Sequence, residues 1–390
     1  MDINKRFPSV AYLERAARQR IPGFVRDYVV HGVGNDVNVR KNRTELDEVE
    51  LMPRYFTDYD QPDLTCQLFG RTYDAPFGVA PMGLTGLIWP RAEAHLAAAA
   101  REQNIPYSLS MVGCATLEET REIAGENGWF QLYTPKEKEV RHDILRRCRE
   151  AGYDTLIVTV DVPYGTRRAH DMRNGLSVPP RFDLRNLWQM MTHPAWALRM
   201  AGAGIPRFVN LAPYYKGDYR SRKAEIQASL EFLMTRLGVH ISPDVLEDIR
   251  SNWPGTLIVK GVLDPDEAAD YASAGANAIV VSNHGGRQLD AAPSSVSALP
   301  RIRERLGPDY PLLVDSGVRS GLDIARMFAL GANFVLMGRP FMYSLGALDH
   351  RGPGHLIDLM KAELRSTMGQ LGCHRIAELP EFLHESSVPR

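Results

Sequence analysis

Ionisable side chains follow short apolar runs at several places in this sequence. His284 comes after the apolar run 278–281 and is followed by two glycines, which leave space around its ring. A histidine in a cleft suits general base catalysis, because its unperturbed pKa of about 6.5 lies near neutral pH. Asp161 follows another apolar run, and a carboxylate near His284 could orient its ring and stabilise its charged form. We therefore predict that His284 is a catalytic base with Asp161 as its partner.

Two arginines follow these residues along the chain. Arg287 lies in the same loop as His284, and Arg168 follows Asp161. A planar guanidinium can bind a carboxylate through two parallel hydrogen bonds. The pair therefore indicates a clamp for a carboxylate substrate. The alternative is that both are solvated surface arginines.

Lys260 directly follows the apolar run 256–259. A lysine at such a position loses hydration unless it meets an anion. It could form a Schiff base with the substrate, as in an aldolase, or neutralise an electron-rich cofactor ring. It could also simply pair with a carboxylate on a neighbouring strand. The residues alone leave these three alternatives open.

The last two apolar runs are each followed by a turn that contains glycine and arginine. Asp315, Gly317 and Arg319 follow the first of them, and Gly338 and Arg339 follow the second. Glycines allow backbone N–H groups to approach phosphate oxygens, and arginine supplies a bidentate positive charge. These turns predict a phosphate site, with two ordinary surface turns as the alternative.

The elements that must position these residues form a repeating pattern. Short apolar runs alternate with amphipathic helical stretches, which is typical of a parallel sheet with helices on its faces. The eight runs are 77–80, 107–109, 129–132, 155–160, 256–259, 278–281, 311–314 and 334–337. Eight such units close into a barrel, whose active site lies at the carboxyl ends of its strands. The sequence therefore predicts an α/β fold, a (β/α)8 TIM barrel.

Two further features complete the predicted architecture. Amphipathic segments at 10–20 and 24–30 predict N-terminal helices ahead of the barrel. Almost a hundred residues separate the fourth and fifth runs, which predicts a long insertion after the fourth strand. No linker rich in glycine and serine divides the chain. We predict one domain over residues 1–390, with residues 182–219 forming a mobile, membrane-facing or partner-facing excursion over the barrel mouth.

Composition excludes several classes of protein. The chain has 46 basic and 47 acidic residues, so no overall positive field exists to hold nucleic acid. The N-terminus lacks the apolar stretch of a signal peptide, and four scattered cysteines favour a reducing, cytoplasmic setting. The sequence holds no HxxEH pattern and no GxGxxG after a strand, so it predicts neither a metal site nor a nicotinamide site.

Residues 282–290, SNHGGRQLD, resemble the active-site signature of the FMN-dependent 2-hydroxy-acid dehydrogenases and oxidases. This family includes glycolate oxidase, L-lactate dehydrogenase and mandelate dehydrogenase. The resemblance extends through 130–133, 159–161, 259–261, 315–319 and 338–340. It implies FMN as the cofactor and oxidation of an L-2-hydroxy acid, similar to lactate or mandelate, to the 2-oxo acid.

The resemblance also implies a role for individual residues. His284 removes the substrate proton with Asp161 beside it, and Tyr133 contacts the substrate hydroxyl. Tyr28, Arg168 and Arg287 hold the carboxylate. Lys260 stabilises negative charge on the reduced flavin. The residues expected to contact the cofactor are Met82, Gly83, Ser110, Gln131, Thr159, Lys260, Ser282, Asp315, Gly317, Arg319, Gly338 and Arg339.

Three positions depart from the family pattern. Gly83 stands where many oxidases have alanine, and glycine there is found in several quinone-linked dehydrogenases. This difference favours a dehydrogenase that passes electrons to a quinone or another carrier, with an oxygen-using oxidase as the alternative. Met82 replaces a common threonine, which would remove one polar contact to the flavin. Val112 replaces the aromatic residue of glycolate oxidase, which predicts a wider pocket.

The excursion combines large apolar and cationic residues. They are Trp188, Met190, Met191, Trp196, Met200, Tyr214 and Tyr215, with Arg185, Arg199, Arg207 and Lys216 among them. Aromatic residues among cations favour a lipid–water interface, and the resemblance adds that some members use this segment to reach quinone in the membrane. We predict peripheral contact with the cytoplasmic face of a membrane. The alternative is a lid or a subunit contact in a homo-oligomer, for which a tetramer is favoured.

Overall fold

Eight parallel strands close into a barrel in the computed structural model. The structure describes residues 2–58, 61–176, 183–204, 206–215, 222–237 and 241–384. In chain order the strands are β3 (Phe77–Met82), β4 (Tyr107–Ser110), β5 (Gly128–Tyr133), β6 (Thr155–Thr159), β7 (Thr256–Val262), β8 (Ala278–Val281), β9 (Leu312–Val314) and β10 (Phe334–Met337). Each strand pairs with the next, and β10 pairs with β3. The predicted TIM barrel is confirmed, and each strand coincides with one apolar run to within a few residues.

The barrel interior is filled by large side chains. Trp129 of β5 and Phe334 of β10 meet there with their ring centroids 6.3 Å apart. A short antiparallel hairpin, β1 (Cys66–Leu68) and β2 (Arg71–Tyr73), precedes the barrel, and its Tyr73 contacts both aromatic rings. The hairpin therefore packs against the filled interior. The sequence pattern did not indicate it, because its strands have only three residues each.

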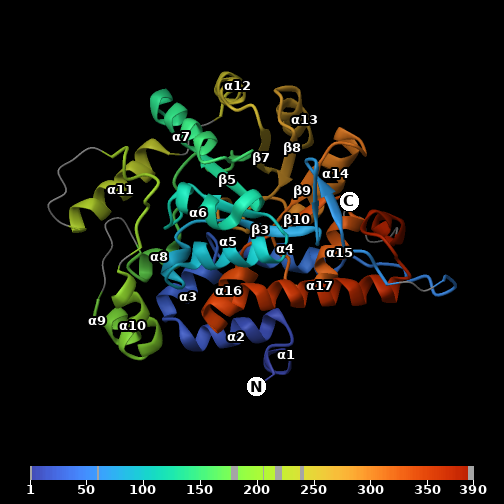
Figure 1. The fold of residues 1–390 in the computed structure, drawn as a ribbon, viewed down its shortest axis with the longest axis horizontal. Helices are drawn as coiled ribbons and strands as arrows, with labels where there is room; N and C mark the ends of the chain where they lie inside the picture. Colours follow the sequence, from blue (N-terminus) through green and yellow to red (C-terminus); the bar gives the residue numbers. More distant parts are fainter. Residues whose placement is uncertain are drawn as a thin grey trace.

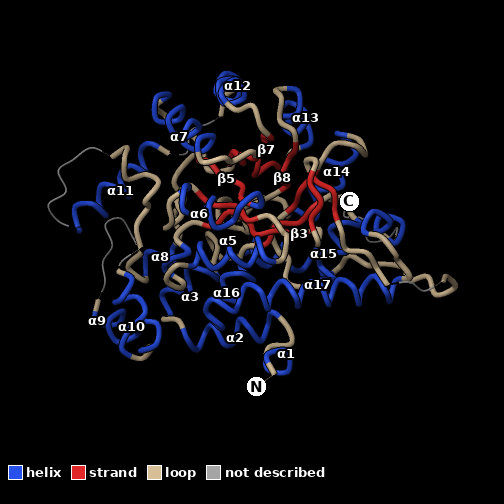
Figure 2. Tube along the Cα trace, in the orientation of Figure 1, coloured by secondary structure: helices blue, strands red, loops and turns tan. Residues whose placement is uncertain are grey.

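Helices surround the strands on the outside, as Figure 2 shows in blue around red. Between successive strands lie α5 (Ala92–Glu102), α6 (Leu117–Ala124), α7 (Lys138–Glu150), α13 (Pro265–Ser273), α14 (Ser295–Leu306) and α15 (Gly321–Ala329). Several begin at a side-chain N-cap: Thr116 accepts a hydrogen bond from Glu119, and Ser320 accepts one from Asp323. Their buried faces are apolar, which explains why the sequence pattern located them.

Helices from both ends of the chain pack together beside the barrel. The N-terminal ones are α1 (Ile3–Arg6), α2 (Val10–Arg20), α3 (Gly23–Val30) and α4 (Val37–Asp47), and the C-terminal ones are α16 (Arg339–Leu348) and α17 (Gly352–Leu371). Figure 1 shows α2 alongside α16, and the two helices are in extensive contact. The N-terminal helices are thereby fixed against the barrel, and α3 carries Tyr28.

The insertion between β6 and β7 contains α8 (Ala169–Arg173), α9 (Leu184–Met191), α10 (Pro194–Ala203), α11 (Arg222–Arg236) and α12 (Pro243–Asn252). Gln189 of α9 accepts a hydrogen bond from the backbone N–H of Phe24 in α3. Trp196 of α10 is buried against Phe24 and donates to the carbonyl of Leu87. Residues 182, 205 and 216–219 of the predicted excursion lie outside the described residues. The described helices include none with the length and hydropathy of a membrane-spanning segment.

Candidate active site

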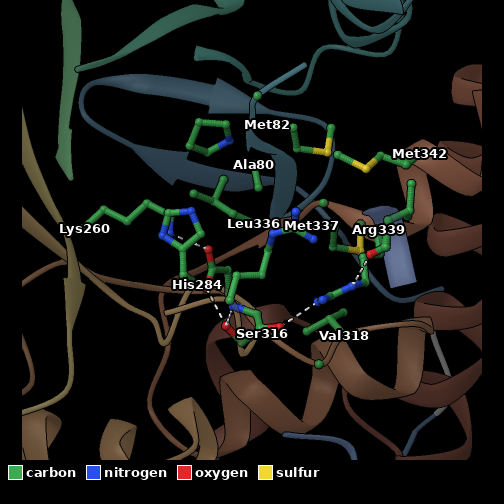
Figure 3. A pocket seen from close by; sticks show the side chains of 18 of the residues that line it. Ala80, Met82, Lys260, His284, Ser316, Val318, Leu336, Met337, Arg339 and Met342 are labelled. Atoms are coloured by element: carbon green, nitrogen blue, oxygen red, sulfur yellow. Dashed lines mark hydrogen bonds and ion pairs between the residues drawn. The ribbon is translucent and has the colours of Figure 1, made fainter. Parts of the chain in front are cut away.

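A cavity lies at the carboxyl ends of the barrel strands, where the sequence predicted the active site. Its volume, measured as the space open to the centres of water molecules, is about 110 Å³, and it is partly open to solvent. Predicted site residues on its wall are Tyr28, Met82, Gly83, Tyr133, Lys260, His284, Arg287, Asp315, Gly317, Arg319, Gly338 and Arg339. In Figure 3, Lys260 and His284 lie on one side of this cavity and Arg339 on the other.

The His284 ring is held by Asp161. Nδ1 of His284 lies 3.0 and 3.2 Å from the two carboxylate oxygens of Asp161. The other ring nitrogen, Nε2, lies 3.5 Å from the hydroxyl of Tyr133. Gly261 leaves space for this pair, because a Cβ there would come within 2.5 Å of the Asp161 carboxylate carbon.

Electrostatics keep Asp161 ionised. Burial alone would raise its pKa, but the charge and hydrogen bond of His284, with the charge of Lys260, outweigh burial and lower it. An ionised Asp161 accepts a hydrogen bond from the Nδ1–H group and leaves the Nε2 lone pair for the cavity. This tautomer is the one that a general base requires.

The backbone of His284 adopts a left-handed conformation, with φ at +58°. Its N–H donates to the Ser282 hydroxyl at 3.0 Å. A non-glycine residue at positive φ is uncommon and points to a constraint from the surroundings. The loop 282–290 is therefore shaped to direct this ring at Asp161.

Lys260 is buried and already has partners. Its Nζ lies 3.0 Å from the Asp315 carboxylate and donates to the Ser282 hydroxyl at 2.9 Å. This is the carboxylate pairing that the sequence left open. A Schiff base needs a neutral amine, whereas a carboxylate partner stabilises the ammonium form. The aldolase alternative therefore finds no support in this geometry.

Three further predicted residues form a buried chain across adjacent strands. The Ser110 hydroxyl donates to Gln131 Oε1 at 2.7 Å, and Gln131 Nε2 donates to the Thr159 hydroxyl at 2.9 Å. Thr159 pairs with Lys260 in the strand register, so the chain ends beside the lysine. The chain fixes the orientation of the Gln131 amide at the base of the site.

Two guanidinium groups lie against the Tyr28 ring. The Cζ atoms of Arg287 and Arg168 are 4.9 and 5.3 Å from the ring centroid. Arg287 donates to the carbonyls of Tyr28 and His31 at the end of α3. Burial lowers the pKa of Arg287, and the charge of Arg168 lowers it further. Of the two, Arg287 lines the cavity, and a pair of adjacent cations at this place suits a carboxylate ligand.

Arg339 and Arg319 lie on the opposite side of the cavity. Arg339 donates to the carbonyls of Val29 and Gly285, while its Nη2 is buried without a hydrogen-bond partner. Burial, together with the charges of Arg319 and Arg287, lowers the pKa of Arg339 to about 9. Neither Arg319 nor Arg339 forms an ion pair within the described part of the chain. Arg339 also opens helix α16, and helix N-termini favour anions.

Comparison with known proteins assigns the family. A model of the family described as FMN-dependent dehydrogenase matches residues 17–385. The chain belongs to this family. It is 38% identical to an L-lactate dehydrogenase of Ectopseudomonas mendocina (strain ymp), over 94% of this chain and 96% of that protein. An L-lactate dehydrogenase of Stenotrophomonas maltophilia (strain R551-3) is also 38% identical, over 93% and 95%.

Solved structures give the same result. The crystal structure of the monotopic membrane protein (S)-mandelate dehydrogenase is 30% identical with a TM-score of 0.90, covering 96% of this chain and 98% of that chain. A mandelate oxidase is 32% identical with a TM-score of 0.80, covering 97% and 98%. The predicted family and the predicted cofactor, FMN, are therefore confirmed.

The cavity fits FMN. A phosphate would supply the anion that Arg319 and Arg339 lack, and Nη2 of Arg339 is an unused buried donor. Gly285 allows the close approach of Arg339, because a Cβ there would lie 2.6 Å from its Nη1. The opposite side offers buried polar groups and the Lys260 charge for a flat polar ring. This FMN-dependent dehydrogenase thus has a site that its cofactor would complete.

Sequence reasoning missed a group of buried asparagines. Asn283, next to His284, exchanges two side-chain hydrogen bonds with Asn42 of α4, at 2.9 and 2.7 Å. Asn38 of α4 also contacts the Asn283 amide, and all three are buried. They fasten the loop of the predicted base to α4. The only signal in the sequence is the spacing of Asn38 and Asn42 by one helical turn.

Proposed function

We propose that this protein oxidises an L-2-hydroxy acid, similar to lactate or mandelate, to the corresponding 2-oxo acid. The observation that carries the proposal is the His284 ring in a cavity that Arg287 also lines: Asp161 holds its Nδ1, and its Nε2 lies near the Tyr133 hydroxyl. A base beside a carboxylate clamp selects a substrate with an acidic proton or hydroxyl next to a carboxylate. The relatives named L-lactate dehydrogenase and (S)-mandelate dehydrogenase act on acids of this type.

The residues divide the work as follows. Arg287, Arg168 and Tyr28 bind the substrate carboxylate, and Tyr133 orients the hydroxyl toward His284. His284 Nε2 takes a proton, and Asp161 stabilises the imidazolium that results. When bound, FMN would supply the acceptor for the two electrons and the second hydrogen that the CH–OH group loses. By holding the substrate carboxylate, the clamp orients the substrate toward His284, and this alignment contributes much of the rate acceleration.

The cofactor contacts fall into two groups. Arg319 and Arg339 would hold the phosphate, assisted by the backbone at Gly317 and Gly338 and by Asp315. The backbone at Met82 and Gly83, the polar chain of Ser110, Gln131 and Thr159, and the side chains of Lys260 and Ser282 would hold the flavin ring. The positive charge of Lys260 favours the cofactor's acceptance of electrons.

Gly83 supports a dehydrogenase in preference to an oxidase. A Cβ at this position would lie 2.7 Å from Cγ2 of Val112, so glycine allows Val112 to pack closely beside the flavin site. We propose that a quinone or another carrier takes the electrons. Oxygen is the alternative acceptor, and a mandelate oxidase of similar fold shows that the family includes oxidases.

Helix α9 and its neighbour α10 supply a surface for membrane contact. Leu184, Trp188 and Leu198 are 84%, 64% and 75% exposed. Trp196, which the sequence grouped with them, is buried, so it belongs to the anchor of this segment and not to its outer face. A solved relative is described as a monotopic membrane protein. We propose that this outer face contacts the cytoplasmic surface of a membrane.

The alternative use of this face is assembly. Large exposed apolar patches are commonly buried in subunit interfaces, and a tetramer remains our prediction for the single 1–390 domain. Replacing Leu184, Trp188 and Leu198 by serine should release the protein from sedimented membranes without slowing flavin reduction. A wild-type protein that stays soluble at low salt would contradict the membrane proposal and favour assembly.

The experiment that tests the activity is anaerobic mixing of the purified protein with a panel of 2-hydroxy acids. The flavin absorbance should bleach with L enantiomers and not with D enantiomers, because one face of the substrate must meet both His284 and the flavin. The same samples, exposed to a quinone analogue or to oxygen, identify the acceptor. Unchanged flavin absorbance with every acid tested would refute the proposal.

A further inference from the structure

Two histidines and an aspartate meet at the edge of the carboxylate clamp. His31 follows the last residue of α3, Asp36 precedes α4, and His170 lies in α8. Nδ1 of His31 lies 2.5 Å from a carboxylate oxygen of Asp36. The rings of His31 and His170 are stacked, with centroids 3.7 Å apart and planes 5° from parallel. One ligand atom from each residue falls within 4.8 Å of those of the other two, and all three side chains are half-buried.

We propose that His31, Asp36 and His170 bind a divalent transition metal ion of the zinc type. Two imidazoles and one carboxylate form a ligand set that such ions favour, with a fourth position left for water. Metal–ligand bonds of about 2.0–2.2 Å in a tetrahedral site place ligand atoms about 3.3 Å apart. The ligand atoms lie within 4.8 Å of one another, and the stacked rings hold their in-plane lone pairs parallel. Binding would therefore require one imidazole to turn out of the stack so that both lone pairs converge on the ion.

The surroundings prepare two of the ligands. The second carboxylate oxygen of Asp36 accepts a hydrogen bond from the Gly32 N–H at 2.7 Å, which orients the group. The ring nitrogens of His170 make no hydrogen bond to any residue that the structure describes, so they are available to an ion.

The site adjoins the proposed substrate clamp on both sides. The His31 carbonyl accepts a hydrogen bond from Arg287, and Asp171, next to His170, pairs with Arg168 at 3.0 Å. A bound ion would join the end of α3 to α8, which are in contact beside each other in Figure 1. It would thereby stiffen the supports of both arginines. This coupling rests on the proposed function, whereas the binding itself does not.

The same chain offers a matched comparison. His95, Asp349 and His350 combine the same residue types elsewhere on the surface, yet their geometry diverges. The two rings are 6.0 Å apart, and both histidine nitrogens lie 3.8 Å from Asp349. Removing His350 therefore controls for zinc bound by exposed histidines in general.

The binding test uses the FMN-loaded protein after treatment with a chelator, titrated with zinc chloride by calorimetry. We expect one site per chain whose affinity falls at least about tenfold in His170→Ala and in Asp36→Asn. Asn at position 36 tolerates the left-handed backbone and can keep the Gly32 hydrogen bond, so its fold should be intact. His350→Ala should bind like the wild type. Equal binding in all four proteins, or none in the wild type, would overturn the site.

A second measurement identifies the ligands. With Cu²⁺ as the probe, electron paramagnetic resonance of the oxidised protein should show coupling to two imidazole nitrogens, and to one in His170→Ala. An unchanged spectrum in that variant would place the metal elsewhere and refute the site.

The coupling to the clamp is tested separately. Zinc should change the KM for the hydroxy acid in the wild type but not in His170→Ala. A KM that ignores zinc, in a protein that binds it, would refute the coupling alone. A flavin that no hydroxy acid reduces would refute the proposed function and leave the binding result unaffected.

Discussion

The two sides of the cavity differ in whether their ionisable side chains have partners within the protein. On the His284 side the polar groups are paired within the protein: Asp161 accepts a hydrogen bond from His284, and Asp315 pairs with Lys260. On the far side Arg319 and Arg339 are half-buried, Nη2 of Arg339 is fully buried, and neither residue has a carboxylate partner among the described residues. Unpaired buried charge is costly, whereas paired charge is tolerated. The first side is therefore preformed, and the second is completed by an anion.

This difference separates two tasks. The preformed side can keep its geometry whether or not the cofactor is bound, because its hydrogen bonds are internal. The arginine side gains most from the FMN phosphate, so cofactor binding should stabilise the fold by mass action. Variants on the two sides should therefore fail in different ways.

The largest effect is expected on the preformed side. His284→Ala removes the base, and general base catalysis contributes about 10²–10⁴-fold to a rate. We expect flavin reduction by substrate to fall toward the upper end of this range while FMN stays bound. Stopped-flow absorbance gives the rate, and the flavin-to-protein ratio gives the occupancy. Near-normal reduction would remove His284 from the mechanism.

A smaller loss is expected at the clamp between the two sides. Arg287→Lys keeps the positive charge but loses the planar fork, which costs about 1.5–3 kcal/mol for a charged hydrogen bond. The KM for the hydroxy acid should rise about tenfold to a hundredfold, because each 1.4 kcal/mol is tenfold in affinity. An unchanged KM would show that Arg287 does not hold the carboxylate.

On the arginine side of the cavity, Arg339→Gln should weaken FMN binding about tenfold, because a charged hydrogen bond to the phosphate is lost. The cofactor-free variant should melt close to the cofactor-free wild type, because removal of a half-buried charge without an ion-pair partner offsets the loss of the hydrogen bonds to Val29 and Gly285. Fluorescence titration with FMN and thermal melts of both apoproteins test this pair of outcomes. A large loss of apoprotein stability would mean that Arg339 is a structural residue.

The smallest effect on stability or activity is expected at Asp248, which pairs with basic residues away from the cavity. Burial would raise the pKa of Asp248, but hydrogen bonds from Arg141, His142 and Lys138 lower it to about 2. Because the folded-state pKa is depressed, this group stabilises the fold above its unfolded pKa of about 3.9. That contribution disappears as pH falls toward about 2. Asp248→Asn should lower the melting temperature at pH 7, at a cost of about 1–3 kcal/mol.

The control for that prediction is the pH dependence of the difference in melting temperature. The melting difference between Asp248→Asn and wild type should shrink as pH falls below about 4, since Asp248 of the unfolded wild-type chain then takes up a proton while folded Asp248 stays ionised down to about pH 2. A difference that stays constant with pH would assign the effect to packing.

The barrel could be predicted because its physics is local. Buried parallel strands read as short apolar runs, and closure brings residues that follow those runs to one mouth. His284, Lys260 and Arg339 lie far apart in the chain yet share one cavity for this reason. The same reasoning did not predict helix α4, because its buried face carries Asn38 and Asn42 where an amphipathic helix usually has apolar residues. Hydrophobic periodicity reports only apolar burial.

Pairings between distant side chains also lie beyond the sequence pattern. Lys260 could have met a cofactor or a carboxylate, and only the fold shows Asp315 within 3.0 Å. The sequence pattern grouped Trp196 with the surface aromatic residues, but its side chain lies on the buried face of α10, against Phe24. The cluster of His31 and His170 joins two separate segments, and neither segment alone predicts a metal. Such contacts depend on how elements pack, which short-range spacing does not encode.

The contrast between the two sides is tested most directly by anaerobic flavin reduction in His284→Ala and Arg339→Gln, both saturated with added FMN and mixed with the same L-2-hydroxy acid. We predict that His284→Ala holds FMN but is barely reduced, whereas Arg339→Gln is reduced at close to the wild-type rate once FMN is in excess. The account would be contradicted if both variants lost reduction to the same degree at saturating FMN, or if His284→Ala lost its cofactor.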